Sequence, residues 1–474
     1  MTRRTKIVAT IGPACNDEAT LVELIEAGAD VLRLNFAHAT HDQHAATIER
    51  VRLAAEKAGR EVGLLGDLPG PKLRIGDIAG DVVELDSGSE FTLTTKPTLG
   101  DAHGASVTWS GLAAALDAGD TVYLADGSIR LKVLESSGDE VRCEVEIGGA
   151  LSSHKGLNLP GVDVDLPAVD ESDMSWIDFS VEHGIDLLAV SFVRSAADLE
   201  PVQARLKQLE VDIPVIAKIE KPQAAQGENA VEIVRAAGGG IMVARGDLGI
   251  EMPIASVPLL QKRLLKLAGR HSKPAITATQ MLASMVTSPR PTRAEVTDVA
   301  NAIYDGTDAV MLSEETAVGR NPVEAVKVMA EIARETEPDL PYGEWLLGRT
   351  SNDEHEIASS VTQGAVGAVY RLGLAAIVVP TSSGRTARMV SAHRPRVPVL
   401  AVSPRIETVR RLNLLFGVRS VLAEQWSGLR DLLAECAMLA EREGVARSGE
   451  LIAITAGLPE QELGTNLFEV HRVP

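Results

Sequence analysis

The sequence predicts an α/β protein built on a (β/α)8 barrel, with a small β-barrel domain inserted into it and an α/β domain after it. Short apolar runs alternate with longer amphipathic stretches, which is typical of parallel strands connected by helices. A tract of alternating β-forming residues interrupts this pattern after the third run, and a second α/β pattern follows the eighth. A doubly wound open sheet is the alternative that the alternation leaves open.

The barrel is expected in residues 1–70 and 167–340, because these segments together hold eight apolar runs of strand length. Eight strands that alternate with helices are enough to close a barrel. The expected strands are Ile7–Ile11, Val31–Asn35, Val62–Asp67, Leu187–Phe192, Val215–Glu220, Ile241–Asp247, Ala275–Gln280 and Ala309–Ser313.

The inserted domain is expected in residues 71–166. Its clearest strands are Thr121–Leu134 and Val141–Ile147, which the turn Ser136–Asp139 connects. An insertion after the third barrel strand lies over the carboxyl end of the barrel, where active sites of this architecture occur. We therefore expect the insertion to be a lid.

The last domain is expected in residues 341–474, after a linker that is rich in proline and acidic residues. Its apolar runs again alternate with amphipathic stretches, which favours a parallel sheet. The expected strands are Ala376–Pro380, Val397–Val402, Val418–Ala423 and Leu451–Ala456.

The composition excludes several classes of partner. The 474 residues include 46 Lys and Arg against 66 Asp and Glu, a net charge of −20 that repels nucleic acid. The only cysteines, Cys15, Cys143 and Cys436, lie far apart and form no metal-binding pattern, which suggests a reducing compartment. No apolar run reaches membrane-spanning length, so we expect a cytoplasmic protein with no membrane partner.

Two neighbouring strand ends carry the residues that indicate chemistry. The run Pro214–Glu220 ends in Lys218 and Glu220, which project from the same face because strand side chains alternate. The run Gly240–Asp247 ends in another carboxylate. Two carboxylates and one cation fit a Mg2+–phosphate substrate. A solvated strand edge or a structural ion pair is the alternative interpretation of either run alone.

The carboxyl ends of all barrel strands meet at one mouth, so polar residues at those ends should converge. This convergence favours a site over independent polar loop residues. The residues that it collects are Arg33, Lys218, Glu220, Asp247, Thr279 and Ser313.

Long motifs along almost the whole chain resemble those of pyruvate kinases, in the order of that family. They are TKIVATIGPA from Thr5, RLNFAH from Arg33, DLPGPKLR from Asp67, KGLNLPG from Lys155, LAVSFVR from Leu188, IAKIE from Ile216, MVARGDLGIE from Met242, KPAITATQML from Lys273 and TRAEVTDVANAIYDGTDAVMLSEETA from Thr292. The resemblance implies phosphoryl transfer from phosphoenolpyruvate to ADP, a lid, a carboxyl-terminal effector domain and a homotetramer.

The resemblance also implies roles for single residues. Glu220 and Asp247 would hold Mg2+ (or Mn2+), and Lys218 and Arg33 would contact the transferred phosphoryl group. Protonation of the enolate would occur near Thr279, through a donor that the sequence does not identify. The remaining implied contacts are Gly246, Asp247, Thr279 and Ser313 for the substrate, and Asn35, His38, Arg74 and Lys155 for the nucleotide, with Asp126 of the lid closing over the site.

Three positions depart from the family pattern. Ala37 replaces a serine whose hydroxyl helps to bind an activating K+ together with the residues at Asn35 and Asp67. Lys72 stands where K+-dependent members tend to have Glu, and an ammonium group can replace a monovalent cation electrostatically. K+ therefore stays a doubtful cofactor, and we hypothesise that activity does not require it. Glu314 replaces a glycine and adds a carboxylate near an anionic substrate.

The last domain carries a candidate phosphate site. Thr381, Ser382, Ser383, Gly384, Arg385 and Thr386 lie between an expected strand and an expected helix. Hydroxyls and free amides at a helix start can bind phosphate, and an ordinary helix cap is the alternative. In pyruvate kinases the matching loop binds the phosphate of an effector, whose identity the sequence does not give.

Two other functions remain open from the sequence. A Mg2+-dependent barrel aldolase that acts on pyruvate or phosphoenolpyruvate would use similar carboxylates, but it would not need Lys155 or the Arg33 and Arg74 pair. A non-catalytic relative would be consistent with Ala37 and Glu314 alone. Dependence of pyruvate formation on ADP separates these functions.

Overall fold

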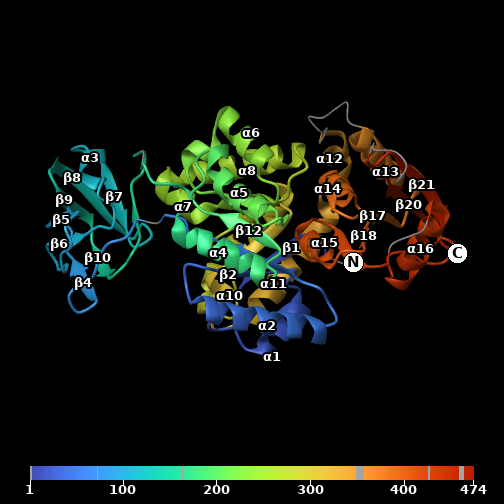
Figure 1. Cartoon of the computed structure of the whole chain (residues 1–474), viewed down its shortest axis with the longest axis horizontal. Coiled ribbons are helices and arrows are strands. Elements are labelled where there is room, and N and C mark those ends of the chain that lie inside the picture. Colours follow the sequence, from blue (N-terminus) through green and yellow to red (C-terminus); the bar gives the residue numbers. More distant parts are fainter. Residues whose placement is uncertain (1–2, 72, 163, 349–356, 425–427, 458–463) are drawn as a thin grey trace.

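The computed structural model describes residues 3–71, 73–162, 164–348, 357–424, 428–457 and 464–474. Lys72, one of the positions that depart from the family pattern, lies outside the described residues. Figure 1 shows three bodies in a row: a small inserted sheet at one end, the barrel in the middle and the carboxyl-terminal domain at the other end. None of the described helices is both long and apolar enough to cross a membrane.

Eight parallel strands close into the barrel that the sequence predicts. Their order around the ring is β1-β16-β15-β14-β13-β12-β3-β2. Nearly every residue of these strands is buried, because helices cover the outside and side chains fill the inside. The strands are β1 (Lys6–Thr10), β2 (Val31–Asn35), β3 (Gly63–Asp67), β12 (Leu187–Val190), β13 (Val215–Ile219), β14 (Gly240–Ala244), β15 (Ala275–Ala278) and β16 (Ala309–Leu312).

Several of these strands end earlier than the apolar runs predict. Phe192 and Thr279 have positive φ angles of 54° and 69°, so the chain has left the extended conformation before it reaches them. The run that includes Asp247 stops at Ala244, and the next residues form the short helix α7 (Arg245–Glu251). Asp247 therefore lies in the first turn of a helix rather than at the end of a strand.

Helices connect the barrel strands and cover them. The starts of α2, α4 and α9 carry complete capping boxes, which satisfy backbone amides that have no partner within the helix. The helices of this part are α1 (Glu18–Ala27), α2 (His41–Lys57), α4 (Glu171–Glu182), α5 (Glu200–Gln208), α6 (Gly227–Ala236), α8 (Val257–Arg270), α9 (Arg293–Tyr304), α10 (Glu314–Ala317) and α11 (Pro322–Thr336).

The chain between β3 and β12 forms two antiparallel-rich sheets with their own apolar core. A six-stranded sheet has the order β11-β7-β8-β9-β5-β6, and β10 pairs with β4 separately. Bridges from Arg74 to Gly156 and from Ile75 to Val107 join the two edges of the six-stranded sheet, beside β11 and β6, as the predicted small β-barrel requires. The elements are β4 (Val82–Leu85), β5 (Glu90–Thr94), β6 (Gly104–Ser106), α3 (Leu112–Ala115), β7 (Thr121–Leu124), β8 (Ile129–Ser137), β9 (Glu140–Ile147), β10 (Gly149–Ser152) and β11 (Leu157–Asn158).

The carboxyl-terminal domain has a five-stranded sheet of order β19-β18-β17-β20-β21. The first four strands are parallel, as predicted, and β21 adds an antiparallel edge that the sequence reading missed. The strand β21 is half-exposed and carries charged residues, so it lacks the continuous apolar run that predicted the other four strands. The elements are α12 (Tyr342–Gly348), α13 (Ile357–Leu372), β17 (Ala376–Pro380), α14 (Arg385–Ala392), β18 (Val399–Ser403), α15 (Ile406–Arg411), β19 (Val418–Leu422), α16 (Leu429–Arg442), β20 (Leu451–Ala456) and β21 (Leu467–Arg472).

A buried ion pair joins this domain to the barrel. Arg394 is only 1% exposed, and its Nη1 and Nη2 atoms lie 2.7 and 2.9 Å from the two carboxylate oxygens of Asp308. The same guanidinium donates to the carbonyl of Gly306 and stacks 4.4 Å from the ring centre of Phe416. This bidentate geometry fixes the two bodies at one contact.

Candidate functional site

A cavity of about 890 Å³ opens at the carboxyl ends of the barrel strands. Its walls come from β1, β2, β3, β13, β14 and β16, from Thr279 just after β15, from α2 and from the first turn of α7. The predicted site residues that line it are Arg33, Asn35, His38, Asp67, Lys218, Glu220, Asp247, Thr279 and Ser313, and Glu314 also lies in its wall.

Lys218 is at the centre of this site. Its Nζ atom lies 3.0 Å from Glu220 Oε1 and 3.1 Å from Asp67 Oδ1, and it donates a hydrogen bond of 2.7 Å to Ser191 Oγ. The side chain is 12% exposed, whereas the two carboxylates are almost fully buried. The residues of β13 and its end thus place a cation and a carboxylate on one face, as the alternation of side chains predicts.

Arg33 is held by a second branch of the same network. Its Nε atom donates to Asp67 Oδ2 at 2.6 Å, and its Nη1 atom donates to Thr10 Oγ1 at 3.1 Å. Asp67 therefore bridges two cations, one on each carboxylate oxygen. These contacts fix both cations in the wall of the cavity before any substrate arrives, which is the preorganisation that electrostatic catalysis needs.

The charged groups of this network shift one another's pKa values. Burial by itself would lower the pKa of Lys218, but Asp67 and Glu220 outweigh it and raise that pKa above its ordinary value. Burial would raise the pKa of Asp67, but Lys218 and Arg33 outweigh it and lower that pKa. For Glu220, burial raises the pKa and Asp247 adds to the rise. Lys218 therefore remains an ammonium, and an added positive charge beside Glu220 would favour its charged form.

Thr279 links two neighbouring strand ends. Its Oγ1 atom accepts a hydrogen bond of 2.8 Å from the backbone amide of Gly246 and donates one of 2.6 Å to the carbonyl of Ala278. A β-branched residue with a positive φ is uncommon and strained, and such strain gathers at functional sites. The strained turn orients the Thr279 side chain toward the start of α7.

Glu220 and Asp247 are the residues that fit a metal ion. Glu220 Oε2 accepts a hydrogen bond of 2.6 Å from the amide of Phe192, which orients this carboxylate. Carboxylate oxygens are the ligands that Mg2+ prefers, and Mg2+ usually takes only one or two from the protein and the rest from substrate and water. Within the described ranges, no cluster of three or more His, Cys, Asp or Glu residues is arranged to hold a metal ion alone. The donor set therefore fits a shared Mg2+ rather than a closed structural metal site.

The oxygens predicted for K+ are already engaged. Asn35 and Asp67 are paired across β2 and β3, so they are neighbours at the mouth. Asn35 Oδ1 accepts a hydrogen bond of 3.3 Å from the amide of Ala37, while both oxygens of Asp67 contact Arg33 or Lys218. His38 lies in the same wall, and its carbonyl contacts the ring of His44 at 2.7 Å.

Two predicted nucleotide contacts lie outside this cavity. Arg74 and Lys155 belong to the segments that lead into and out of the inserted sheets, and Arg74 Nη1 donates to the carbonyl of His154 at 3.0 Å. Neither residue is part of the cavity wall. Asp126, which the resemblance also places on the lid, occupies a tight turn with a φ of 53°. The barrel-mouth residues thus lie together, whereas the lid residues lie apart from them.

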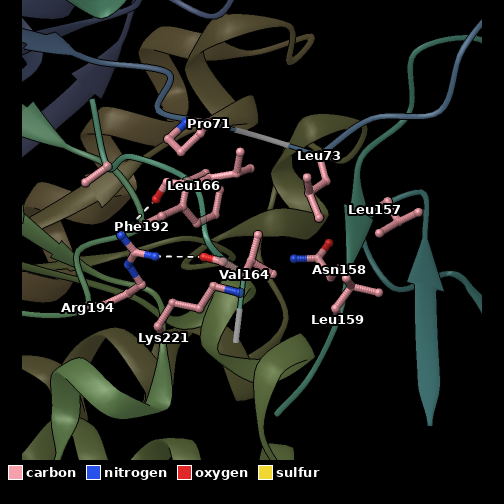
Figure 2. A pocket seen from close by; sticks show the side chains of 11 residues that line it. Pro71, Leu73, Leu157, Asn158, Leu159, Val164, Leu166, Phe192, Arg194 and Lys221 are labelled. Atoms are coloured by element: carbon pink, nitrogen blue, oxygen red, sulfur yellow. Dashed lines mark hydrogen bonds between the residues drawn. The ribbon is translucent and has the colours of Figure 1, made fainter. Parts of the chain in front are cut away.

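The junction between the inserted domain and the barrel is shown in Figure 2, around a small cavity of about 50 Å³. Arg194 donates to the carbonyls of Val164 and Leu166, at 2.8 and 2.9 Å, and so ties the returning lid segment to the barrel. Lys221 lies 2.7 Å from Glu251 Oε1, to which Asn158 of the lid also donates. These polar contacts connect the inserted domain to the barrel.

The loop predicted to bind an effector phosphate has a defined internal structure. The amide of Gly384 donates to Thr381 Oγ1 at 3.0 Å, and Gly384 has a φ of 80° immediately before α14. Thr386 Oγ1 lies 2.5 Å from Thr465 Oγ1, and the carbonyl of Ser382 accepts from Thr408 at 2.8 Å. Part of the loop, including Ser383 and Arg385, lines a cavity against the barrel.

Three contributors to the site were not singled out from the sequence. Ser191 accepts from Lys218, Thr10 accepts from Arg33, and the carboxylate of Glu315 accepts from the amides of Ser313 and Leu282 at 2.7 and 3.1 Å. Thr10 is the last residue of β1, so its place at a strand end is a signal that would have found it. The contacts of Ser191 with Lys218 and of Glu315 with Leu282 join segments far apart in the chain, which a local pattern does not reveal.

Comparison with known proteins gives two matches to family models. Residues 2–326 match the model described as pyruvate kinase, barrel domain, and residues 359–471 match the model described as pyruvate kinase, alpha/beta domain. Together these models cover most of the chain and coincide with the barrel and with the carboxyl-terminal sheet.

Similar whole proteins agree with these models. The chain is 44% identical to a pyruvate kinase of Geobacillus stearothermophilus, over 99% of this chain and 80% of that protein. It is 42% identical to a pyruvate kinase of Thermococcus litoralis, over 99% of both. A crystal structure of a pyruvate kinase from Cryptosporidium parvum superimposes with a TM-score of 0.93 and 34% identity, covering 100% of this chain and 96% of that one. The chain therefore belongs to the pyruvate kinase family.

Proposed function

We propose that this protein catalyses the Mg2+-dependent transfer of a phosphoryl group from phosphoenolpyruvate to ADP, with pyruvate and ATP as products. One observation carries this proposal beyond family membership. Lys218 lies between the carboxylates of Asp67 and Glu220 in the wall of a cavity that also contains Arg33 and Asp247. Phosphoryl transfer depends mainly on positioning and on neutralising charge, and this arrangement supplies both.

The cations of the mouth act on the transferred phosphoryl group. The ammonium of Lys218 faces the cavity with its charge ensured by two carboxylates, so it neutralises charge as the phosphoryl group leaves one oxygen and joins another. Arg33 is held rigidly by Asp67 and Thr10 and presents a second cation to the same group. The amide end of α7, near Gly246, suits the substrate carboxylate.

The metal would be held by Glu220 and Asp247. When bound there, Mg2+ would neutralise negative charge on the oxygens of the substrate. The contact of Glu220 with Phe192 keeps that carboxylate oriented, while Lys218 is close enough to stop it from repelling an anionic substrate. Protonation of the enolate that remains would occur near Thr279.

The nucleotide would bind between the barrel mouth and the lid. Asn35 and His38 lie in the cavity wall, and Arg74 and Lys155 lie on the lid segments. Closure of the lid would bring these two cations toward the phosphates of ADP. Closure would also exclude water, which protects the phosphoryl group from hydrolysis.

We further propose that activity does not require K+. Ala37 offers no hydroxyl ligand, and the carboxylate of Asp67 is occupied by Arg33 and Lys218. An assay in K+-free tetramethylammonium buffer should give nearly the same rate as an assay in KCl. Strong stimulation by K+ would contradict this proposal.

The proposal includes a cellular setting. We infer a cytoplasmic homotetramer whose carboxyl-terminal domain binds a phosphorylated effector at Thr381–Thr386. The family supports the tetramer and the effector. The hydroxyl-rich loop before α14 supports a phosphate ligand.

An assay of pyruvate and ATP together tests the proposed function. The protein should form both in equal amounts, and pyruvate formation should stop when ADP is omitted. An aldolase would form or consume pyruvate without ADP. A folded protein that forms no pyruvate from phosphoenolpyruvate and ADP would overturn the proposal.

A further inference from the structure

One buried carboxylate at the edge of the barrel contacts both the barrel and the inserted domain. Glu251 is the last residue of α7 and is only 6% exposed. Its Oε1 atom lies 2.7 Å from Lys221 Nζ, and the same oxygen accepts a hydrogen bond of 3.3 Å from Nδ2 of Asn158 in β11. Figure 2 shows the side chains of Lys221 and Asn158 pointing toward one another. Glu251 thus joins three segments that are far apart in the chain.

Each of these segments leads directly to a residue of the proposed reaction. Lys221 immediately follows Glu220, and the first turn of α7 carries Asp247. The strand β11 begins two residues after Lys155 and pairs with β7, so it belongs to the six-stranded sheet of the inserted domain. Glu251 is therefore connected through short segments to both proposed metal ligands and to one proposed nucleotide contact.

The last turn of α7 makes a second contact with the inserted domain. The turn that contains Gly127 connects β7 and β8 and packs against this helix, because a Cβ atom at Gly127 would lie 3.2 Å from Ile250 Cγ1. Gly127 has a φ of 88°, which glycine adopts without strain. Figure 1 shows α7 on the side of the barrel that faces the inserted sheets. The end of α7 is therefore a support for the inserted domain.

Asn158 lies where the chain passes between the two domains. It lines the small cavity of Figure 2 together with Pro71, on the segment that leaves the barrel, and Val164, on the segment that returns. Points close to an axis of rotation move least, so a rotation of the inserted domain about this junction would displace Asn158 less than the distant strands. The contact with Glu251 can therefore persist during such a rotation and act as a pivot.

We propose that Glu251 is a positioning residue, the pivot that sets the angle at which the inserted domain approaches the barrel mouth. The inference rests on the proposed function in one respect, because it takes ADP as the nucleotide. A hydrogen bond to a carboxylate is roughly twice as strong as one between neutral groups, so this contact can fix the approach of Lys155 and Arg74 to the phosphates of ADP. Weakening the pivot raises the KM for ADP more than it lowers kcat, because Lys218 and its partners stay in place.

Exchanging the donor and the acceptor of this hydrogen bond tests the proposal. Asn158→Asp places two carboxylates against each other, so the KM for ADP should rise about tenfold while kcat stays within about threefold of the wild type. The double variant Asn158→Asp/Glu251→Gln keeps the size of both side chains and leaves one carboxylate beside Lys221. Its amide can donate to the new carboxylate, so the KM for ADP should return to within about threefold of the wild type.

Ser137→Asp is the matched control, because it adds the same charge to the inserted domain away from the pivot. Ser137 is exposed at the end of β8 opposite to the turn that contacts Ile250, so the KM for ADP should not change. Amide hydrogen exchange gives a readout that does not depend on catalysis. Exchange at the end of α7, where the amide of Met252 donates to the carbonyl of Leu248, should be faster in Asn158→Asp and normal in the double variant.

Three outcomes would overturn the proposal: an unchanged KM for ADP in folded Asn158→Asp, an equal rise in Ser137→Asp, or no recovery in the double variant. A wild type that forms no pyruvate would refute the proposed function instead, and hydrogen exchange would then decide whether Glu251 is the pivot. If Asn158→Asp does not fold, Asn158→Ala removes the donor without adding a charge and should raise the KM for ADP about threefold. An unchanged KM in that variant would likewise refute the proposal, and circular dichroism establishes that each variant is folded.

Discussion

Replacing Lys218 by methionine should separate the structural and catalytic effects of its charge. Methionine keeps a similar length but removes the ammonium that lies 3.1 Å from Asp67 and 3.0 Å from Glu220. Asp67 keeps its contact of 2.6 Å with Arg33, so the loss falls mainly on Glu220, for which the described residues leave only the amide of Phe192. Both stability and rate should therefore fall, for different reasons.

The stability effect follows from breaking a buried pair. Removing one partner of such a pair costs about 3–5 kcal/mol, and the remaining contacts of Asp67 place this case near the lower figure. Burial already raises the pKa of Glu220, and the loss of Lys218 should raise it further. Protonated Glu220 is easier to bury, so the destabilisation should shrink as the pH falls below the raised pKa of the variant. Chemical denaturation at several pH values measures this.

The fall in kcat is expected to be separate from the fall in stability. Glu220→Gln removes the uncompensated charge, so the double variant Lys218→Met/Glu220→Gln should regain most of the lost stability. The kcat of folded Lys218→Met should fall by about 10²–10³, as for one preorganised electrostatic contact. A folded single variant with a kcat within tenfold of the wild type would refute this account of Lys218.

Two further predictions concern the scaffold around the site. Burial raises the pKa of Asp173, which accepts from the amide of Gly70 in the lid hinge, to about 6. Because the folded protein holds this proton more tightly than the unfolded chain, the group favours folding at low pH and disfavours it above pH 6. Asp173→Asn should therefore remove a pH dependence of at most about 3 kcal/mol between pH 4 and 7. A denaturation midpoint that shifts with pH identically in both proteins would contradict this prediction. Arg394→Met leaves the carboxylate of Asp308 buried without its guanidinium partner, so the free energy of unfolding should fall by about 3–5 kcal/mol. The double variant Arg394→Met/Asp308→Asn should recover part of that free energy. A fall of less than about 1 kcal/mol in the single variant would contradict this prediction.

The barrel was predictable because its strands are buried on both faces and therefore read as continuous apolar runs. The exact strand ends were not, because Phe192 and Thr279 turn the chain through positive φ angles that composition does not signal. The edge strand Leu467–Arg472 was missed because one side of it meets solvent and carries charge.

The candidate site was predictable where it depends on neighbours along one strand. Lys218 and Glu220 share a face because side chains alternate, so their contact follows from the local sequence. The bridge from Arg33 through Asp67 to Lys218 depends on packing of the side chains of three strands across the barrel mouth, which a single sequence does not give.

The most direct test of the central claim is a Mg2+ titration of ADP-dependent pyruvate formation, with the wild type and Glu220→Ala side by side. The wild type should require Mg2+, and Glu220→Ala should lose most of its rate and need more Mg2+ for the remainder, since one of two carboxylate ligands is gone. Circular dichroism would establish that the variant is folded. Unchanged rate and unchanged Mg2+ dependence in folded Glu220→Ala would contradict the assignment of this site.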